Sequence, residues 1–516
     1  MDTRRKRILS ITALALLSGL LAAVLALPAI LTAFLPEVLR QAGFKDVSLT
    51  VLHLSWDRLE LEAVSLDQAV SAKRLSITFT PFGLTGLEAK NLNLKAKTDG
   101  KSLRLGHLVL PFAGNAQGDD FNLPHIKLDQ ARFDLDTQMG PVRGILNSEH
   151  EGAAMRLRLE LSSGSKPALF RPLILTGLLT AEGPELSFAG RLNDPMHRLV
   201  IGIKGHQNQQ TATGEAKIEL KRIEFDQSGL QPHDLFPILE PFLKDVSGPF
   251  EGQAQLAWRD GKLTSLANLH SHGLSFESQG AAVRNLMGTL SLNRLWPLRT
   301  PAPQSFSFGM LSAGAPLGSG AVAFSLEDDG SIFFKRAVLN LADGKLRLDP
   351  VRIDPDLNGT LNFQASNVHL SSLAPLFQIE GIALDGIVDG VIPVHLTSDG
   401  MKISGARLTA RDKGFVRYRP ASAPAALQDS QEGVSLMMAA LKDFRYDSLA
   451  LGLDGQAGGE TTVTFQIKGR NPGLHNGVPF ELNFRLSGPL DRLAKQAYGI
   501  ISLPEQIEAA LAETNR

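Results

Sequence analysis

Apolar and polar residues alternate with a period of two along most of the chain, and this pattern restricts the fold more than any other feature. Residues 155–161 read Met-Arg-Leu-Arg-Leu-Glu-Leu, and the same alternation recurs at 216–221, 463–468 and 480–486. Successive side chains of a β-strand point to opposite faces, so each segment is predicted to be a strand with one apolar and one polar face. The sequence therefore predicts a mainly β, antiparallel body with a few short helices.

An uncharged stretch of 28 residues, Ile8–Leu35, follows a basic cluster at residues 4–7. A helix that crosses a bilayer needs about 20 apolar residues, and basic residues tend to stay in the cytoplasm. The stretch is longer than the apolar part of a secretory signal peptide and ends without a clear cleavage motif, so an uncleaved anchor is favoured over a cleaved signal. The expected anchoring residues are Ile8, Leu14, Leu17, Leu21, Val24, Leu31 and Leu35.

Composition excludes several classes of protein. The chain has 52 Lys and Arg against 53 Asp and Glu, a balance that does not favour nucleic-acid binding. It has no cysteine, so disulfides, thiolate catalysis and Cys-ligated metals are excluded. His270 and His272 share one face of a predicted strand, but no third ligand is indicated. We expect neither an enzyme nor a bound metal or cofactor.

The anchor and the disulfide-free composition together predict a single-pass inner-membrane protein with its bulk in the periplasm. Helical patterns occur at 234–244, 371–378, 424–442 and near the C-terminus. The predicted organisation has five parts: a cytoplasmic tip and anchor (1–36), a first β body (37–297), a Pro-, Gly- and Ser-rich linker or loop (298–320), a second β body (321–488) and C-terminal helices (489–516).

An internal repeat is visible at an offset of 138 residues. Each copy has a strand, a short helix containing proline, and a Gly-x-x-x-Gly motif that opens a new strand. Five pairs of residues carry the repeat, Phe225 with Phe363, Leu235 with Leu373, Pro237 with Pro375, Gly248 with Gly386 and Gly252 with Gly390. Recurrence in register favours a modular body of stacked units.

The C-terminal third contains a set of short motifs: Leu384-Asp385-Gly386-x-x-Asp389-Gly390-x-Ile392-Pro393-Val394, Leu408-Thr409-Ala410-Arg411, Gly414-x-x-Arg417-Tyr418, Asp443-Phe444-Arg445-Tyr446 and Lys468-Gly469-Arg470-Asn471-Pro472. This combination resembles the C-terminal domain of YdbH-type proteins, members of the AsmA-like group of bridge-like inter-membrane lipid transfer proteins. An older label for the domain is "dicarboxylate transport", but one predicted span is too few for a transporter with a midplane site.

The resemblance implies an anchored β-sheet groove, a "β-taco", that carries phospholipid from the inner towards the outer membrane and contributes to outer-membrane lipid homeostasis. It also implies a small outer-membrane lipoprotein as partner. The candidate lining residues are Leu157, Leu159, Leu161, Ile218, Leu220, Val463, Phe465 and Ile467. The candidate partner edge, where a second chain can add a strand, comprises Phe480, Leu482, Phe484 and Leu486.

Alternation alone leaves two architectures open. A sheet with one apolar face hides that face either against a second sheet or by curving around an apolar ligand. The periodicity is the same in a closed sandwich and in an open groove, and only the resemblance favours the groove. The alternative function is an envelope scaffold or outer-membrane assembly factor that does not conduct lipid.

Overall fold

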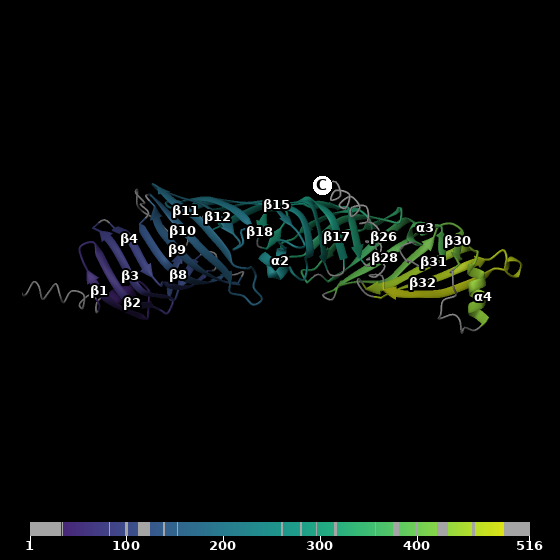
Figure 1. Cartoon of the computed structure of the whole chain (residues 1–516), viewed down its shortest axis with the longest axis horizontal. Coiled ribbons are helices and arrows are strands. Elements are labelled where there is room, and N and C mark those ends of the chain that lie inside the picture. Colours follow the sequence, from purple (N-terminus) through teal and green to yellow (C-terminus); the bar gives the residue numbers. More distant parts are fainter. Residues whose placement is uncertain are drawn as a thin grey trace, which may run out of the picture. The chain divides into compact units, whose positions relative to one another are not determined.

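The computed structural model describes residues 32 and 35–489, except for 82, 99–101, 112–123, 138–139, 152, 260–261, 279–280, 296, 314–316, 357, 375–380, 398–399, 420–431 and 457–459 (Figure 1). The chain divides into two compact units. The first comprises residues up to 221 together with 233–238 and 253–265; the second comprises 222–232, 239–252 and residues from 266 onward. This division differs from the one predicted at residues 298–320.

A short helical segment at 35–41 precedes the sheet. The strands that follow, up to the first short helix, are β1 (Val47–Leu54), β2 (Arg58–Leu66), β3 (Val70–Thr80), β4 (Gly83–Lys90), β5 (Asn93–Thr98), β6 (Ser102–Leu105), β7 (Leu108–Pro111), β8 (His125–Thr137), β9 (Gly140–Glu151), β10 (Ala154–Ser163), β11 (Leu173–Glu182), β12 (Glu185–Asn193), β13 (Val200–Asn208) and β14 (Thr213–Phe225).

In the first unit most of these strands pair with their neighbours in sequence, and Figure 1 shows β8 to β12 side by side. An exception to the predicted antiparallel order is β8, which pairs in parallel with β4 and then with β5. The hairpin of β6 and β7 lies between β5 and β8 in sequence, and β8 runs in the same direction as β5. A buried cluster that includes Leu49, Val51 and Leu61 closes one part of this unit.

The remaining elements, in order, are α2 (Pro232–Leu235), η1 (Pro237–Leu239), β15 (Lys244–Arg259), β16 (Lys262–Ser278), β17 (Ala281–Leu292), β18 (Arg294–Leu295), β19 (Leu298–Arg299), β20 (Gln304–Phe308), β21 (Met310–Ala313), β22 (Gly320–Leu326), β23 (Ile332–Leu341), β24 (Gly344–Leu348), β25 (Val351–Ile353), β26 (Gly359–His369), α3 (Leu370–Leu373), β27 (Ile382–Asp385), β28 (Ile387–Thr397), β29 (Gly400–Ala410), β30 (Gly414–Tyr418), α4 (Glu432–Leu441), β31 (Phe444–Gln456), β32 (Glu460–Arg470), η4 (His475–Gly477) and β33 (Phe480–Pro489).

The second unit is antiparallel in its described pairings, with β28, β29, β31, β32 and β33 as successive neighbours. Its apolar side chains form a large buried cluster that extends from Phe308 to Leu482 and includes residues of α3 and α4. The prediction of a mainly β, antiparallel fold with few short helices is confirmed for both units. The close packing of this second unit distinguishes it from much of the first.

Two sequence expectations need comment. Residues 298–320 are not a continuous linker or loop, because they contain β19, β20 and β21; in β20, Phe306 and Phe308 alternate with serines as in other strands. The expected anchor lies almost wholly outside the described residues, as do the expected C-terminal helices beyond Pro489. Within the described part of the chain, no helix has the length and apolar character needed to cross a membrane.

The two copies of the internal repeat share a backbone feature. Gly248 and Gly386 have φ values of +111° and +129°, a region that L side chains rarely adopt. Four residues later, a Cβ on Gly252 would lie 2.7 Å from Cδ2 of Leu269, and a Cβ on Gly390 would overlap the carbonyl oxygen of Arg407. The bend therefore favours glycine at Gly248 and Gly386, and the close approach of the next strand requires it at Gly390, whereas at Gly252 a Cβ would meet the end of a flexible leucine side chain.

Candidate functional site

An uninterrupted row of aliphatic side chains crosses six strands of the first unit. The register places Leu159 of β10 opposite Leu146 of β9 and opposite Leu175 of β11. The same row continues through β12, β13 and β14 with Leu192, Ile201 and Leu220. We call these six residues the aliphatic row. Six strands at about 4.8 Å spacing give a row about 24 Å long, against about 15 Å for the acyl half of a bilayer core.

A second row lies beside the aliphatic row and contains two glycines. Leu157 aligns with Gly177 and Gly190, and the row ends on Ile203 and Ile218. The ring of Phe188 occupies the space that the glycines leave, because a Cβ built on either would lie 2.6 Å from a ring carbon. The glycines thus make room for an aromatic side chain that continues the apolar surface.

The aliphatic row is only partly buried, since each of its six side chains keeps some exposure to solvent. None of the six belongs to the buried clusters of the described residues, although Leu146 packs against the edge of one. The opposite face of the same strands is polar, with Arg156, Arg158 and Glu160 exposed on β10. The sheet therefore presents a continuous aliphatic surface that its own side chains do not close.

The structure brings together five of the predicted lining residues. Leu157, Leu159 and Leu161 lie on one face of β10, and Ile218 and Leu220 lie on the same face of β14, four strands away. Sequence reasoning missed Leu146, Leu175, Leu192 and Ile201, which complete the row. Their alternation is visible in the sequence, for example in Ile201-Gly202-Ile203-Lys204, but the register that aligns them is not.

The three predicted lining residues of β32 lie in a different environment. Val463, Phe465 and Ile467 are 7%, 2% and 0% exposed and belong to the large buried cluster. In this packed state they offer no surface to a ligand. Lipid contact at these positions stays a prediction that requires the cluster to open.

Several motif residues of the C-terminal third hold strands together around Tyr446. The buried Tyr446 hydroxyl donates a hydrogen bond of 2.7 Å to the carbonyl oxygen of Asp385. Gly386 and Gly414 lie against this hydroxyl, where a Cβ would collide with it. Burial, followed by the negative charges of Asp385 and Asp412, raises the pKa of Tyr446 to about 12.

Two ion pairs and one amide complete this arrangement. Arg417 donates to Asp443 at 2.7 Å, and Arg411 donates to Asp389 through two nitrogens. The side-chain amide of Asn471 donates to the carbonyl oxygens of Ala439 and Ala440 at the end of α4, at 3.1 and 3.0 Å. In the structure these motif residues therefore hold neighbouring strands and the end of α4 together within the second unit.

Replacing Tyr446 with Phe is expected to lower the stability of the second unit by about 1 kcal/mol, because the Asp385 carbonyl loses its buried donor. The raised pKa also predicts an alkaline effect. Below pH 10 the tyrosine is protonated in both states; between pH 10 and about 12 only the unfolded state releases the proton, so stability falls. Urea titrations of wild type and Tyr446→Phe at several pH values test this. An equally steep alkaline loss in both proteins would contradict the assignment.

The predicted partner edge lies on β33, which pairs with β32 over ten residue pairs. Phe480 packs on Phe444 with ring centroids 5.2 Å apart, and Leu482 is buried in the large cluster. The side chains of Phe484 and Leu486 lie outside the described set. Among the described strands, β33 has no second neighbour.

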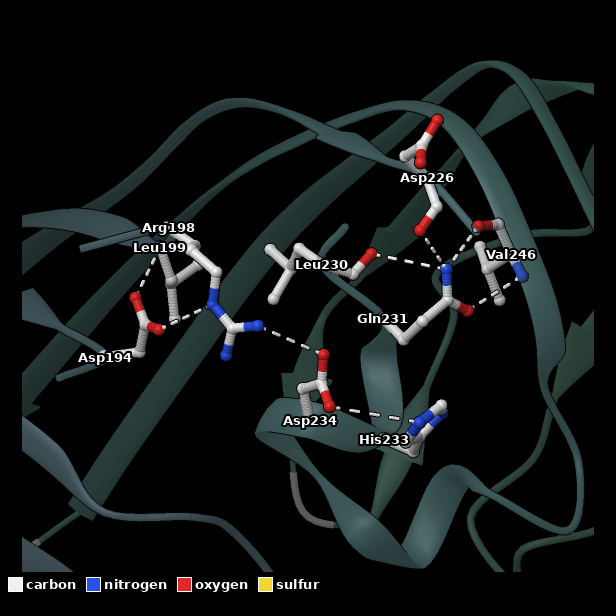
Figure 2. A network of polar contacts seen from close by, with 9 residues as sticks. All are labelled: Asp194, Arg198, Leu199, Asp226, Leu230, Gln231, His233, Asp234 and Val246. Atoms are coloured by element: carbon white, nitrogen blue, oxygen red, sulfur yellow. Dashed lines mark hydrogen bonds and ion pairs between the residues drawn. The ribbon is translucent and has the colours of Figure 1, made fainter. Parts of the chain in front are cut away.

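Figure 2 shows two polar networks, each within one unit. In the first unit, Arg198 bridges Asp194 and Asp234 at 3.0 and 3.2 Å. Burial opposes ionisation of Asp194, but hydrogen bonds from the Leu199 amide and Arg198 outweigh it and lower its pKa. In the second unit, the side chain of Gln231 pairs with both backbone groups of Val246 at 2.8 and 3.0 Å. Both networks hold the segments that link successive strands, and neither includes a residue of the aliphatic row.

The two histidines considered in the sequence have other partners. His270 lies 2.9 Å from the Thr289 hydroxyl, and His272 lies 3.0 Å from a carboxylate oxygen of Glu251. A search of the described residues finds no group of three side chains suited to hold a metal ion.

A sheet with a continuous and partly exposed aliphatic face defines a class, namely β-proteins that offer an apolar surface to a ligand. Comparison with protein families shows which family within this class the chain belongs to. The model of the YdbH-like family, described as "Intermembrane phospholipid transport protein YdbH", matches residues 101–511. Because the match covers most of the chain, the protein belongs to this family of intermembrane phospholipid transport proteins, and the resemblance predicted from the sequence is confirmed. Searches of curated proteins and of solved structures found no match.

Proposed function

We propose that the first unit holds phospholipid acyl chains on the aliphatic row, as part of a groove that conducts lipid between the inner and outer membranes. The observation that carries this proposal is the alignment of six aliphatic side chains, from Leu146 to Leu220, on a face that remains partly exposed. An exposed apolar row of this extent is costly in water, by about 25 cal/mol for each Å² left uncovered. An acyl chain laid across the row removes that cost.

The polar face of the same strands supports this assignment. Arg158 pairs with Glu160 at 3.1 Å on the opposite side of β10, so that side is suited to water. A sheet that is apolar on one face and charged on the other can separate an acyl chain from solvent. No chemical step is needed for this task, and the proposal gives the protein no catalytic residue and no cofactor.

The anchor proposal places the N-terminus in the cytoplasm, Ile8–Leu35 in the inner membrane and the two β units in the periplasm. Its support is the uncharged stretch of 28 residues after the basic cluster. The helical segment at 35–41 continues directly from the end of this stretch. A protein held in this way receives phospholipid at one membrane and contributes to the lipid balance of the other.

At the other end of the chain, we propose that a small outer-membrane lipoprotein pairs with β33 and extends the sheet. Replacing Asn483 or Arg485 with Pro removes one backbone donor from β33 and is expected to abolish this pairing. Photo-crosslinkers placed singly from Glu481 to Leu486 test the contact in intact cells. The control position is Met196, which is 73% exposed in the first unit. A partner captured reproducibly from Met196 and not from β33 would place the contact elsewhere.

Phospholipid that copurifies with the full chain tests the conduit function. The protein is extracted from membranes in mild detergent, washed, and analysed for bound phospholipid by mass spectrometry. We expect at least one phospholipid for each chain. A protein that is folded but free of phospholipid would favour the alternative function of an envelope scaffold or assembly factor.

A further inference from the structure

Trp56 is the most exposed large apolar side chain among the described residues. It lies at the tip of the hairpin between β1 and β2 and is 98% exposed. The turn is ordered, because the amide of Ser55 donates to the carbonyl oxygen of Arg58 at 2.8 Å. Tryptophan is usually largely buried, and its exposed position on a well-formed turn indicates a surface that something else covers.

A second apolar tip lies next to the first. The amide of Phe79, near the end of β3, donates to the carbonyl oxygen of Asp57 at 2.9 Å. The following turn leads into β4, where Leu84 is 52% exposed. The β1–β2 and β3–β4 turns therefore lie side by side at one end of the first unit's sheet, and each presents an uncovered apolar side chain.

The helical segment before β1 points towards this same end. The amide of Val51, in the middle of β1, donates to the hydroxyl of Thr32 at 2.9 Å. The other end of the segment lies at the start of β1, where the carboxylate of Asp67 accepts hydrogen bonds from the backbone amides of Lys45 and Asp46. The segment thus runs antiparallel to β1, and Thr32 lies nearer than the rest of the segment to the end of the sheet that carries Trp56.

The length of β1 beyond Val51 can be compared with the length of chain between the end of the membrane span and Thr32. Trp56 is five strand residues beyond Val51, or about 16 Å at about 3.3 Å per residue. A helix that begins at Ile8 crosses the hydrocarbon core in about 20 residues and leaves it near Leu27. Thr32 then lies about 8 Å below that level, at 1.5 Å per residue. The reach of Trp56 beyond Val51 therefore exceeds this gap of about 8 Å, so the tip of the β1–β2 hairpin contacts the bilayer, and a strand that is inclined to the membrane normal brings Trp56 to the interfacial layer.

We propose that Trp56 and Leu84 insert into the interfacial layer of the bilayer that holds the anchor. Tryptophan is enriched at this depth, because its ring is apolar and its N–H can bond to headgroups and water. The inference rests on the anchor described under the proposed function. A helix alone leaves the sheet free to tilt and rotate; two inserted tips hold this end of the sheet against the lipid surface.

Tryptophan fluorescence of the full chain in vesicles tests the insertion. The chain has three tryptophans, so Trp258→Phe and Trp296→Phe leave Trp56 as the only emitter. The vesicles contain phosphatidylethanolamine and phosphatidylglycerol, with or without bromine atoms on the acyl chains near the headgroup. The control carries Trp56→Phe and Met196→Trp in the same background, because Met196 is 73% exposed far along the same unit's chain.

We expect brominated lipid to lower Trp56 emission roughly twofold and to leave the Met196→Trp emission unchanged, since only an interfacial ring contacts the lipid. Flotation of the vesicles reports the anchor separately. A protein that floats with the vesicles while Trp56 remains unquenched overturns the insertion and leaves the anchor intact. A protein that does not float overturns the anchor and the insertion together. Neither outcome depends on phospholipid copurification, which tests the groove.

Discussion

The variant Leu175→Asp is expected to lose most of the phospholipid that copurifies with the wild-type chain. Leu175 lies in the middle of the aliphatic row, flanked by Leu159 and Leu192 on the neighbouring strands. A carboxylate that contacts an acyl chain loses its hydration without gaining a partner, at a cost of several kcal/mol. Each 1.4 kcal/mol corresponds to about a tenfold loss of affinity. Mass spectrometry of the purified variant measures the loss.

The matched control for this variant is Leu178→Asp. Leu178 lies on the same strand and points to the opposite, polar face, where it is 42% exposed. Both variants make the same chemical change three residues apart, and both positions keep access to water, so both chains are expected to fold. Equal phospholipid content in the two variants would contradict the assignment of the aliphatic row.

The variant Phe465→Ala is expected to destabilise the second unit by about 3–5 kcal/mol, as truncation of a buried aromatic side chain usually does. Phe465 is 2% exposed and packs within the large cluster. By contrast, Leu159→Ala in the first unit is expected to cost only about 1 kcal/mol, because Leu159 already contacts water and leaves a smaller cavity. The two substitutions therefore separate a closed core from an open face.

Hydrogen exchange of the full chain measures both effects unit by unit, which avoids treating two units as one transition. In Phe465→Ala, faster exchange is expected in β31 and β32, while β9 to β11 keep their wild-type rates. Leu159→Ala is expected to change exchange only slightly, and only in β9 to β11. A loss of protection in β9 to β11 as large as that caused by Phe465→Ala in β32 would indicate that Leu159 is part of a sealed core.

Alternation predicted the strands well, because a period of two is a local property of the chain. It identified the apolar face of β10 at Leu157, Leu159 and Leu161, and the equivalent face of β14. It could not show that Leu220 and Leu159 lie in one row, since this depends on the register of four intervening pairings. The aliphatic row is thus a long-range property that was only half visible in the sequence.

The same pattern also gave no information about what covers an apolar face. Val463, Phe465 and Ile467 alternate with polar residues as regularly as the leucines of β10, yet they are buried in a packed cluster. The covering side chains come from distant segments, such as Leu373 of α3 and Leu441 of α4. Residues 298–320 were misjudged for a related reason, because serine and glycine content concealed the alternation around Phe306.

The most direct test of the central claim is lipid crosslinking across the two faces of the first unit. A photo-crosslinking amino acid is placed singly at Leu159 and Leu175 on the aliphatic row, and at Arg158 and Leu178 on the opposite face. The proteins are irradiated in intact cells and analysed by mass spectrometry after purification. The groove predicts phospholipid adducts at Leu159 and Leu175 and none at the two opposite positions. Adducts at neither face, or at both faces alike, would contradict a groove on this sheet.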